Sequence, residues 1–192
     1  MVAQDPDVLY WPQYLTPEDA DQLYEHCSGA LAWRQETIRM FGRVVLQPRL
    51  QVWMGDMAYR YSGRTFEPTP WDEQLTALAR RFQDELQVPF NSVLCNWYQS
   101  GAHSMGWHSD NEPELGNEPV IVSVSIGAAR RFVLRQRSNH QQRLEYLLGH
   151  GDVLVMRGRT QQRWEHALPK TQKPVGARIN LTYRYLLRSP QP

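Results

Sequence analysis

The chain contains only two cysteines, Cys27 and Cys95, which lie far apart in its 192 residues. So few thiols set no disulfide framework, and a reducing compartment is expected. No apolar run approaches the roughly 18 residues of a membrane span. The first residues, with Asp5 and Asp7 near Met1, lack the basic and then apolar pattern of a signal peptide. We therefore expect an intracellular protein, cytoplasmic in a bacterium or nuclear in a eukaryote, with no membrane partner.

Internal repeats, low-complexity tracts and interdomain linkers are absent from the sequence as well. With 41% hydrophobic residues, the chain is long enough to bury a sizeable core without disulfides. We predict one domain over residues 1–192, present as a monomer.

Two helix signals precede a series of short alternating segments. Thr16-Pro17-Glu18-Asp19 combines a capping hydroxyl, a first-turn proline and early acids, which predicts a helix through about Cys27. Thr69-Pro70 repeats the signal, and apolar residues at helical spacing follow it as far as Leu86. Beyond Pro89 the chain predicts strands at 92–98, 120–126, 131–134, 144–148, 153–156 and 178–187. This order indicates an α+β fold that is mainly β, a cupin-like jelly roll (double-stranded β-helix) with flanking N-terminal helices.

Two histidines and one aspartate have the composition of a metal site. His108 and Asp110 form an H-x-D step, and His166 follows much later in the chain. Two imidazoles and a carboxylate are the ligands of the facial triad that binds non-haem Fe(II) and leaves neighbouring positions open. The pattern is weak alone, because the chain has six histidines, and His103 is the main rival ligand.

Polar residues alternate along two of the predicted strands. In the strand from Arg178, the residues at 178, 180, 182 and 184 share one face and include two arginines. Guanidinium groups bind carboxylates in a bidentate manner, so a dicarboxylate such as 2-oxoglutarate would suit this face. Leu94, Asn96 and Tyr98 likewise share a face of the strand at 92–98. Taken alone, each segment favours an ordinary interpretation over a co-substrate site: a surface ladder of basic residues for the strand from Arg178, and a core strand with a satisfied Asn for the strand at 92–98.

In this combination and order, the motifs resemble the AlkB family of Fe(II)/2-oxoglutarate dioxygenases, which reverse alkylation damage in nucleic acids. The similarity extends from about Met40 to Leu187 and includes the N-x-Y, H-x-D and R-x-N-x-T-x-R motifs and the strand at 122–127. The resemblance implies that His108, Asp110 and His166 bind Fe(II) and form the catalytic centre, with O2 as a further co-substrate. The residues that would position 2-oxoglutarate are Asn96, Tyr98, Arg178, Asn180 and Arg184.

Within this family the sequence is most similar to the duplex-DNA branch. Met40-Phe41-Gly42-Arg43 looks like the finger of that branch, and Pro48-Arg49, Met54-Gly55-Asp56 and the stretch at 59–63 resemble the segment that follows it. Residues 1–90 would then hold the N-terminal helices and the nucleotide-recognition segment, and residues 91–188 the jelly-roll catalytic core. Asn111 departs from the acidic or basic residue that related enzymes often have there, which concerns substrate preference more than chemistry.

The apolar pair Met40-Phe41 is compatible with a wedge that replaces an extruded base, and equally with a core strand. Glu112 is compatible with recognition of a base edge or with a solvated loop. The residues predicted to contact the substrate are Met40, Phe41, Gly42, Arg43, Trp53, Tyr59, Tyr61, Glu112, Arg130 and Arg131, although at least one of the three aromatic residues after the finger is expected in the core.

The near-neutral net charge of +1 hides a basic C-terminal part. Residues 128–188 carry 13 lysines and arginines against three acidic residues. This asymmetry favours a polyanionic partner. The arginines expected near strand ends, where they reach phosphates or simply solvate the loops, are Arg130, Arg131, Arg135, Arg137, Arg143, Arg157, Arg159 and Arg163.

The sequence therefore predicts a dioxygenase that removes small alkyl groups from nucleobases such as 1-methyladenine and 3-methylcytosine in DNA. One alternative is an oxygenase of the same fold that acts on RNA, a protein or a small molecule. Another is a non-catalytic β-fold that binds damaged nucleic acid. The complete triad beside Arg178 argues against the latter, because a binding module has no use for a co-substrate pocket.

Overall fold

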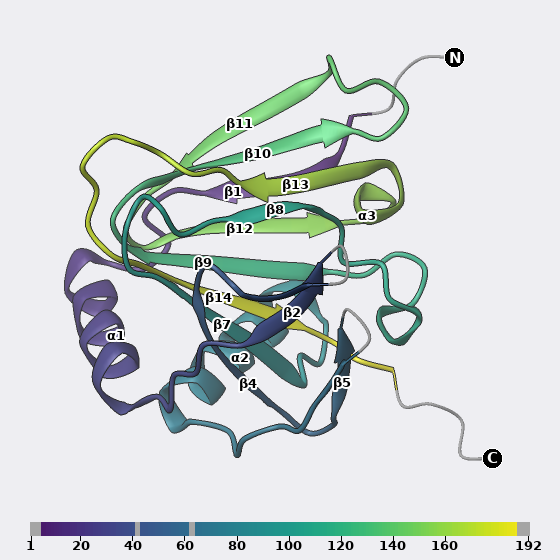
Figure 1. Cartoon of the computed structure of the whole chain (residues 1–192). Helices are drawn as coiled ribbons and strands as arrows, with labels where there is room; N and C mark the ends of the chain where they lie inside the picture. The colour runs from purple at the N-terminus through teal and green to yellow at the C-terminus, as the bar shows by residue number, and fades with distance from the viewer. Residues whose placement is uncertain (1–4, 41–42, 62–63, 188–192) are drawn as a thin grey trace.

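The computed structural model describes residues 5–40, 43–61 and 64–187. Its strands form two antiparallel sheets that face each other, a larger one of six strands and a smaller one of four (Figure 1). Four short strands form two separate two-stranded sheets: β2 (Thr37–Met40) pairs with β3 (Arg43–Leu46), and β5 (Tyr59–Tyr61) pairs with β6 (Arg64–Phe66). The prediction of a mainly β, jelly-roll fold with N-terminal helices is confirmed.

Strand β14 (Arg178–Arg184) lies in the interior of the larger sheet. It pairs with β9 (Ile121–Gly127) on one side and with β7 (Ser92–Tyr98) on the other. Its strands, in spatial order, are β1 (Asp7–Trp11), β12 (Asp152–Arg157), β9 (Ile121–Gly127), β14 (Arg178–Arg184), β7 (Ser92–Tyr98) and β4 (Leu50–Gly55). Strands β1 and β4 come from the first 90 residues and complete the sheet at its two edges. The N-terminal segment is thus part of the jelly roll, which the sequence pattern after Pro89 did not indicate.

The smaller sheet brings two distant histidines together. Its strands, in spatial order, are β11 (Arg143–Leu148), β10 (Arg130–Gln136), β13 (Trp164–Leu168) and β8 (Met105–His108). In the pairing of β13 with β8, His166 lies directly opposite His108. The short elements outside the two sheets are β2 (Thr37–Met40), β3 (Arg43–Leu46), β5 (Tyr59–Tyr61), β6 (Arg64–Phe66), the 3-10 turn η1 (Pro113–Leu115) and α3 (Thr160–Arg163).

Helix α1 (Pro17–Ala30) begins where its sequence signal predicts, since the Thr16 hydroxyl accepts a hydrogen bond from the Asp19 N–H at 3.1 Å. Helix α2 (Glu73–Leu86) begins later than the Thr69-Pro70 signal predicts. Its cap is Asp72, whose carboxylate accepts from the N–H groups at the start of the helix.

Thr69 has a different role, because its hydroxyl donates to the Trp53 carbonyl of β4 at 2.8 Å. The threonine therefore ties the segment before α2 to the edge of the larger sheet. A Ser or Thr hydroxyl can satisfy either partner, so the sequence alone does not distinguish a cap from such a contact.

Both helices cover one face of the larger sheet and form the main apolar core with it. Leu75 and Phe82 of α2 pack in the same buried cluster as Leu181 and Tyr183 of β14. The Tyr183 hydroxyl also donates to the Leu75 carbonyl at 3.2 Å. Each such buried apolar side chain contributes about 1.5–3 kcal/mol, so this face of the sheet holds the fold together.

The opposite face of the larger sheet points toward the smaller sheet and is polar. Alternation along β14 places Ile179, Leu181 and Tyr183 in the core. The residues between them, at 178, 180, 182 and 184, line a cavity between the two sheets. The predicted face of β14 is therefore confirmed.

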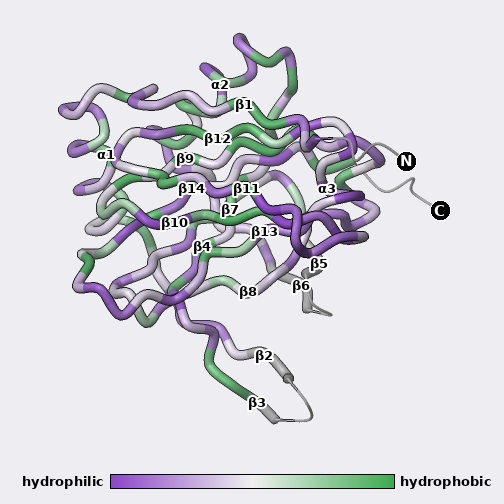
Figure 2. Tube along the Cα trace, turned by 90° about the horizontal axis from the view of Figure 1, so that it is seen from above, coloured by the Kyte–Doolittle hydropathy of each residue, from purple (hydrophilic) through white to green (hydrophobic). Residues whose placement is uncertain are grey.

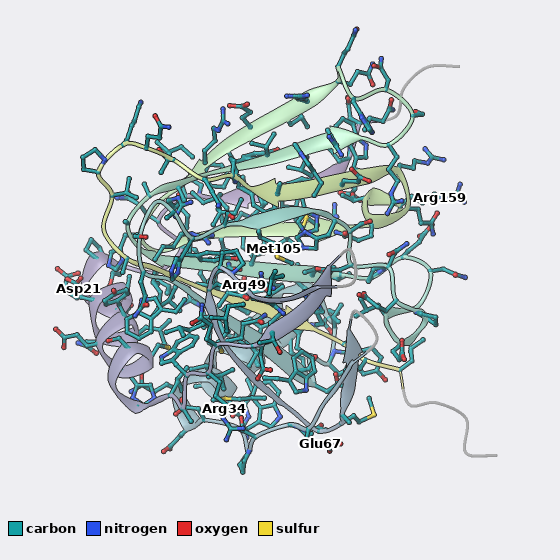
Figure 3. All side chains as sticks on the ribbon, viewed as in Figure 1. Asp21, Arg34, Arg49, Glu67, Met105 and Arg159 are labelled. Carbon is teal, nitrogen blue, oxygen red and sulfur yellow. The ribbon has the colours of Figure 1, made fainter. Side chains whose placement is uncertain are left out.

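Strands β2 and β3 form a hairpin that extends away from the body of the molecule (Figure 2). Arg49, just before β4, and Met105 of β8 lie near the middle of the molecule, whereas Asp21, Glu67 and Arg159 lie toward its outside (Figure 3). Among the described residues, no helix is long and apolar enough to cross a membrane.

Candidate active site

Three candidate metal ligands meet at the cavity between the sheets. His108 ends strand β8, Asp110 follows it in the next loop, and His166 lies in β13. One ligand atom from each lies within 4.8 Å of the other two, and the imidazole rings are 4.2 Å apart between centroids. The rival His103 is not part of this cluster. Its Nδ1 accepts a hydrogen bond from the Gln99 N–H at 3.2 Å.

The orientation of the His108 ring suits a metal ligand. Its Nδ1 lies 2.8 Å from the Gly106 carbonyl oxygen. Because a carbonyl only accepts, Nδ1 carries the proton, and the lone pair is on Nε2. This Nε2 faces the Asp110 Oδ1 at 4.0 Å.

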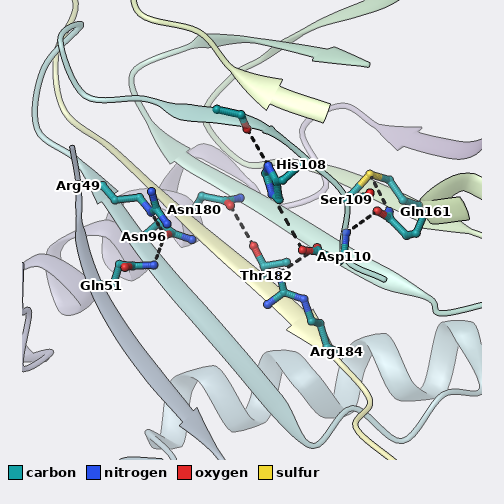
Figure 4. A network of polar contacts seen from close by, with 12 residues as sticks. Arg49, Gln51, Asn96, His108, Ser109, Asp110, Gln161, Asn180, Thr182 and Arg184 are labelled. Carbon is teal, nitrogen blue, oxygen red and sulfur yellow. Dashed lines mark hydrogen bonds and ion pairs between the residues drawn. The ribbon is translucent and has the colours of Figure 1, made fainter. Parts of the chain in front are cut away.

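Asp110 is buried and uses only one of its carboxylate oxygens within the protein. The Oδ2 atom accepts from an Arg184 NH2 group at 2.8 Å. The Oδ1 atom is buried without a hydrogen-bond partner. A buried acceptor without a partner is costly, and a cation beside the two imidazoles satisfies it. The donor set therefore fits a divalent metal. Figure 4 shows His108, Asp110 and Arg184 of this network.

The electrostatics of the cluster keep the three groups in the protonation states that a metal requires. Burial raises the pKa of Asp110, but the Arg184 guanidinium and the two imidazoles outweigh burial, so this pKa lies well below its usual range. Burial and the neighbouring His108 lower the pKa of His166 to about 3. Burial also lowers the pKa of His108. Both imidazoles are therefore neutral, and the carboxylate is charged, at physiological pH.

A second unsatisfied group lies on β14 at the same cavity. Arg178 is only 2% exposed, and one of its NH2 groups donates to the Ser125 hydroxyl at 2.8 Å. Its Nε has no partner, and no described carboxylate pairs with it. Burial lowers its pKa to about 10, so the guanidinium stays charged at neutral pH. A buried cation of this kind fits the carboxylate of a bound ligand.

The other predicted co-substrate residues also line the cavity, but the structure divides their roles. The Tyr98 ring lies 5.6 Å from the Arg178 guanidinium carbon. The Asn96 oxygen accepts from Arg49 Nε at 2.8 Å and from the Gln51 amide at 3.1 Å, so both residues hold its side chain at the cavity wall. The Asn180 amide nitrogen donates to the Ser123 hydroxyl and to the Val124 carbonyl, so it joins β14 to β9.

Two residues that were predicted to contact the substrate lie in buried positions, and Trp53 is thereby the core residue expected among the three aromatic residues after the finger. Arg130 is 2% exposed and donates to the carbonyl oxygens of Ser100, His103 and Pro169 at 2.9–3.2 Å, so it does not reach a phosphate. Trp53 is 5% exposed and packs in an apolar cluster with Leu115 and Leu186, so it offers no face to a base. Both side chains were assigned from sequence proximity alone, whereas their burial depends on the tertiary packing.

The remaining substrate contacts stay predictions. Phe41 and Gly42 lie outside the described residues, as do the side chains of Met40, Arg43, Tyr59 and Tyr61. Arg131 is on the surface, with its NH1 3.4 Å from Glu145 Oε1. Glu112 lies two residues beyond Asp110, where it begins the turn η1.

Two buried polar residues near the site were not predicted. Arg49 is 4% exposed and holds Asn96. Gln161 of α3 is 1% exposed and accepts a hydrogen bond from the Asp110 backbone N–H at 2.9 Å. The sequence places Arg49 inside the segment that resembles the family, but neither residue lies in a periodic pattern that indicates burial.

Comparison with known proteins agrees with this geometry. The family model of the 2OG-Fe(II) oxygenase superfamily matches residues 7–184. The chain is therefore a 2OG-Fe(II) oxygenase, which uses Fe(II) with 2-oxoglutarate and O2 as co-substrates.

The relatives define the family more narrowly. The chain is 36% identical to the human alpha-ketoglutarate-dependent dioxygenase alkB homolog 3, over 96% of its length and 68% of the relative. It is 34% identical to the DNA oxidative demethylase ALKBH2 of Arabidopsis thaliana, over 94% of its length and 67% of the relative. The chain belongs to the AlkB family of dioxygenases. The chain is nearly equally identical to both relatives. A substrate like that of the duplex-DNA branch therefore stays a prediction.

A solved structure, that of OsALKBH1, has the same fold. It superposes with a TM-score of 0.69 and 16% sequence identity, and the match covers 95% of this chain and 99% of that one. At this identity the match supports the architecture of the two sheets and nothing finer.

The buried position of Arg130 gives a test of its corrected role. We expect Arg130→Gln to lower the free energy of unfolding by about 2–4 kcal/mol, because three carbonyl groups lose their donor. The neighbouring Arg131→Gln is the matched control and should change it by less than about 0.5 kcal/mol. Urea unfolding measures both. Native stability in Arg130→Gln, together with weakened nucleic-acid binding, would restore the phosphate role.

Proposed function

We propose that the protein oxidatively removes small alkyl groups from nucleobases in DNA, with 1-methyladenine and 3-methylcytosine as representative substrates. The observation that carries the proposal is one cavity that holds both unsatisfied groups, the Asp110 Oδ1 and the Arg178 guanidinium. The first fits a metal ion, and the second fits a carboxylate of 2-oxoglutarate.

The residues of the cavity divide the work of this reaction. His108, Asp110 and His166 hold the iron, and Arg184 holds the carboxylate of Asp110 in place through the 2.8 Å ion pair. Arg178 would bind a carboxylate of 2-oxoglutarate. The Tyr98 ring and the Asn96 amide form the wall beside it.

When bound, Fe(II) with 2-oxoglutarate and O2 supplies the oxidant that inserts oxygen into a C–H bond. On an N-methylated base this insertion gives an N-hydroxymethyl group. The C–N bond of that group then breaks, which releases the unmodified base and an aldehyde. The protein's part is to place the alkyl carbon at the metal and to keep competing groups away.

Nucleic acid is the substrate class that the surroundings favour. The relatives of the chain include proteins named DNA oxidative demethylase. In residues 128–188, Arg130, Arg178 and Arg184 are buried, but exposed basic side chains remain, among them Arg143, Lys170 and Lys173, and these suit a phosphate backbone. The hairpin of β2 and β3 projects beside the main body, with the Met40↔Arg43 pair at its far end (Figure 2). A protein or a small-molecule substrate requires neither feature.

The direct test is a demethylation assay. The protein is incubated with iron, ascorbate, 2-oxoglutarate and oligonucleotides that carry 1-methyladenine or 3-methylcytosine, and the products are weighed by mass spectrometry. We expect each oligonucleotide to lose the mass of one methylene group, and His166→Ala to abolish this loss. Succinate formation with unchanged DNA, and with a methylated RNA or a peptide consumed instead, would assign another substrate class.

The co-substrate site has its own test. We expect Arg178→Gln to raise the 2-oxoglutarate concentration needed for half-maximal succinate formation by more than tenfold, because loss of a buried charge-assisted pair costs about 2–5 kcal/mol. Arg178→Lys keeps the charge but loses the bidentate geometry, so its effect should be intermediate. Affinity for DNA should not change in either variant. An unchanged requirement for 2-oxoglutarate in Arg178→Gln would remove this arginine from the site.

The predicted wedge is tested by comparing two forms of one substrate. If Phe41 replaces an extruded base, Phe41→Ala should slow repair of a lesion in a duplex much more than repair of the same lesion in a single strand, where no base stack has to be opened. Initial rates on matched oligonucleotides measure the difference. Equal losses on both substrates, at native stability, would exclude the wedge.

A further inference from the structure

The short helix α3 (Thr160–Arg163) lies between β12 and β13 and contacts the loop that follows the H-x-D motif. The Gln162 amide donates to the Asn117 carbonyl of this loop. Arg159, just before the helix, donates from its Nε to Glu118 at 3.1 Å. These contacts are exposed and lie at the far end of the loop, away from the metal ligands.

Gln161 makes a different contact at the near end of the same loop. Its side chain is buried, at 1% exposure. Its oxygen accepts from the backbone N–H of Asp110 at 2.9 Å, and its amide nitrogen donates to the sulfur of Met156 at 3.4 Å (Figure 4). Met156 in turn lines the cavity, whereas Gln161 is outside the cavity wall.

Asp110 is therefore held at two points. Gln161 fixes its backbone, and Arg184 fixes the Oδ2 atom of its carboxylate at 2.8 Å. With both points fixed, the free Oδ1 is directed at the His108 Nε2, 4.0 Å away. Loss of either contact lets the carboxylate turn or shift, and a metal ligand that is displaced in this way binds more weakly.

We propose that Gln161 is a positioning residue for the metal site, which acts by holding the main chain of Asp110. The inference rests on the iron ligands assigned above and extends them to a residue that touches neither metal nor co-substrate. The chemistry requires an acceptor at this place, because an apolar side chain leaves a buried N–H unsatisfied, and the loop then moves to satisfy it. Because α3 leads directly into β13, the same contact couples Asp110 to the strand of His166.

The test measures metal binding without turnover. Metal-free protein is titrated with Mn(II) in the absence of oxygen, and the free ion is followed by electron paramagnetic resonance. Gln161→Met removes the acceptor at nearly constant volume, and Gln161→Asn withdraws it by one methylene group. Gln161→Glu keeps an acceptor at the same reach. Gln162→Met is the matched control, because it removes the exposed contact of the same helix with the same loop.

We expect Gln161→Met and Gln161→Asn to weaken Mn(II) binding by about 10- to 100-fold, the usual effect of removing a group that supports a metal ligand. Gln161→Glu should bind Mn(II) more tightly than Gln161→Met, and Gln162→Met should match the wild type. Thermal unfolding of the metal-free variants identifies any that do not fold, and Gln161→Asn, as the mildest change, keeps the comparison available.

Wild-type affinity in folded Gln161→Met and Gln161→Asn would overturn the inference while leaving the proposed ligands intact. An equal loss in Gln162→Met would also overturn it, since general packing of the loop would then explain the effect. Absence of Mn(II) binding by the wild type would instead contradict the ligand set, and the inference with it.

Discussion

The alternation of side chains along β14 is the constraint on which the rest of the structure depends. This strand is central in the larger sheet, and all seven of its residues are buried. One of its faces gives Leu181 and Tyr183 to the apolar core under the helices, and the other presents Arg178 and Arg184 to the cavity. A shift of one residue in its pairing would exchange these faces and put two guanidinium groups into the core. The pairing that stabilises the fold is thus also the pairing that builds the site.

The two buried arginines of β14 have opposite relations to their surroundings. Arg184 is paired with Asp110, and removing one partner of such a buried pair typically costs about 3–5 kcal/mol. Arg178 has no described acidic partner: it donates to the Ser125 hydroxyl and lies 5.6 Å from the Tyr98 ring. An anion would therefore be stabilised beside Arg178, and a cation would be stabilised beside the Asp110 Oδ1. Fe(II) together with 2-oxoglutarate would supply the positive charge at Asp110 and the negative charge at Arg178.

Local periodicity explains why much of this site could be predicted from the sequence. The face of β14 and the strand with Asn96 and Tyr98 follow from the period of two. The H-x-D step and a distant histidine have the residue types of a facial metal triad, which made them recognisable as ligands. In the structure, the register of β13 against β8 brings His166 to His108. The resemblance to a known family joined these separate patterns into one site, and the cavity brings the same residues together.

The residues that sequence reasoning misplaced depend on contacts between distant segments. Trp53 follows the predicted finger, where an aromatic ring can stack on a base, yet it packs with Leu115 and Leu186 in an apolar cluster. Arg130 belongs to a basic run in which its neighbour Arg131 is indeed at the surface, and only the approach of two loops makes it a buried donor. Neither outcome has a signal in the local sequence, because a side chain's partners are set by packing.

Two buried polar atoms in the cavity oppose folding, because the described part of the protein does not satisfy them. The buried Asp110 Oδ1 and the Arg178 Nε each lack a partner within the described chain, and an unsatisfied buried group costs about 1–3 kcal/mol. A ligand that binds only the folded state stabilises that state, and above its dissociation constant this stabilisation increases with the logarithm of the ligand concentration. Hydrogen bonds of Asp110 with Gln161 and Arg184, and of Arg178 with Ser125, fix the positions of both groups. The polar network around the site therefore holds the Asp110 carboxylate and the Arg178 guanidinium in the positions at which a metal ion and a carboxylate would bind.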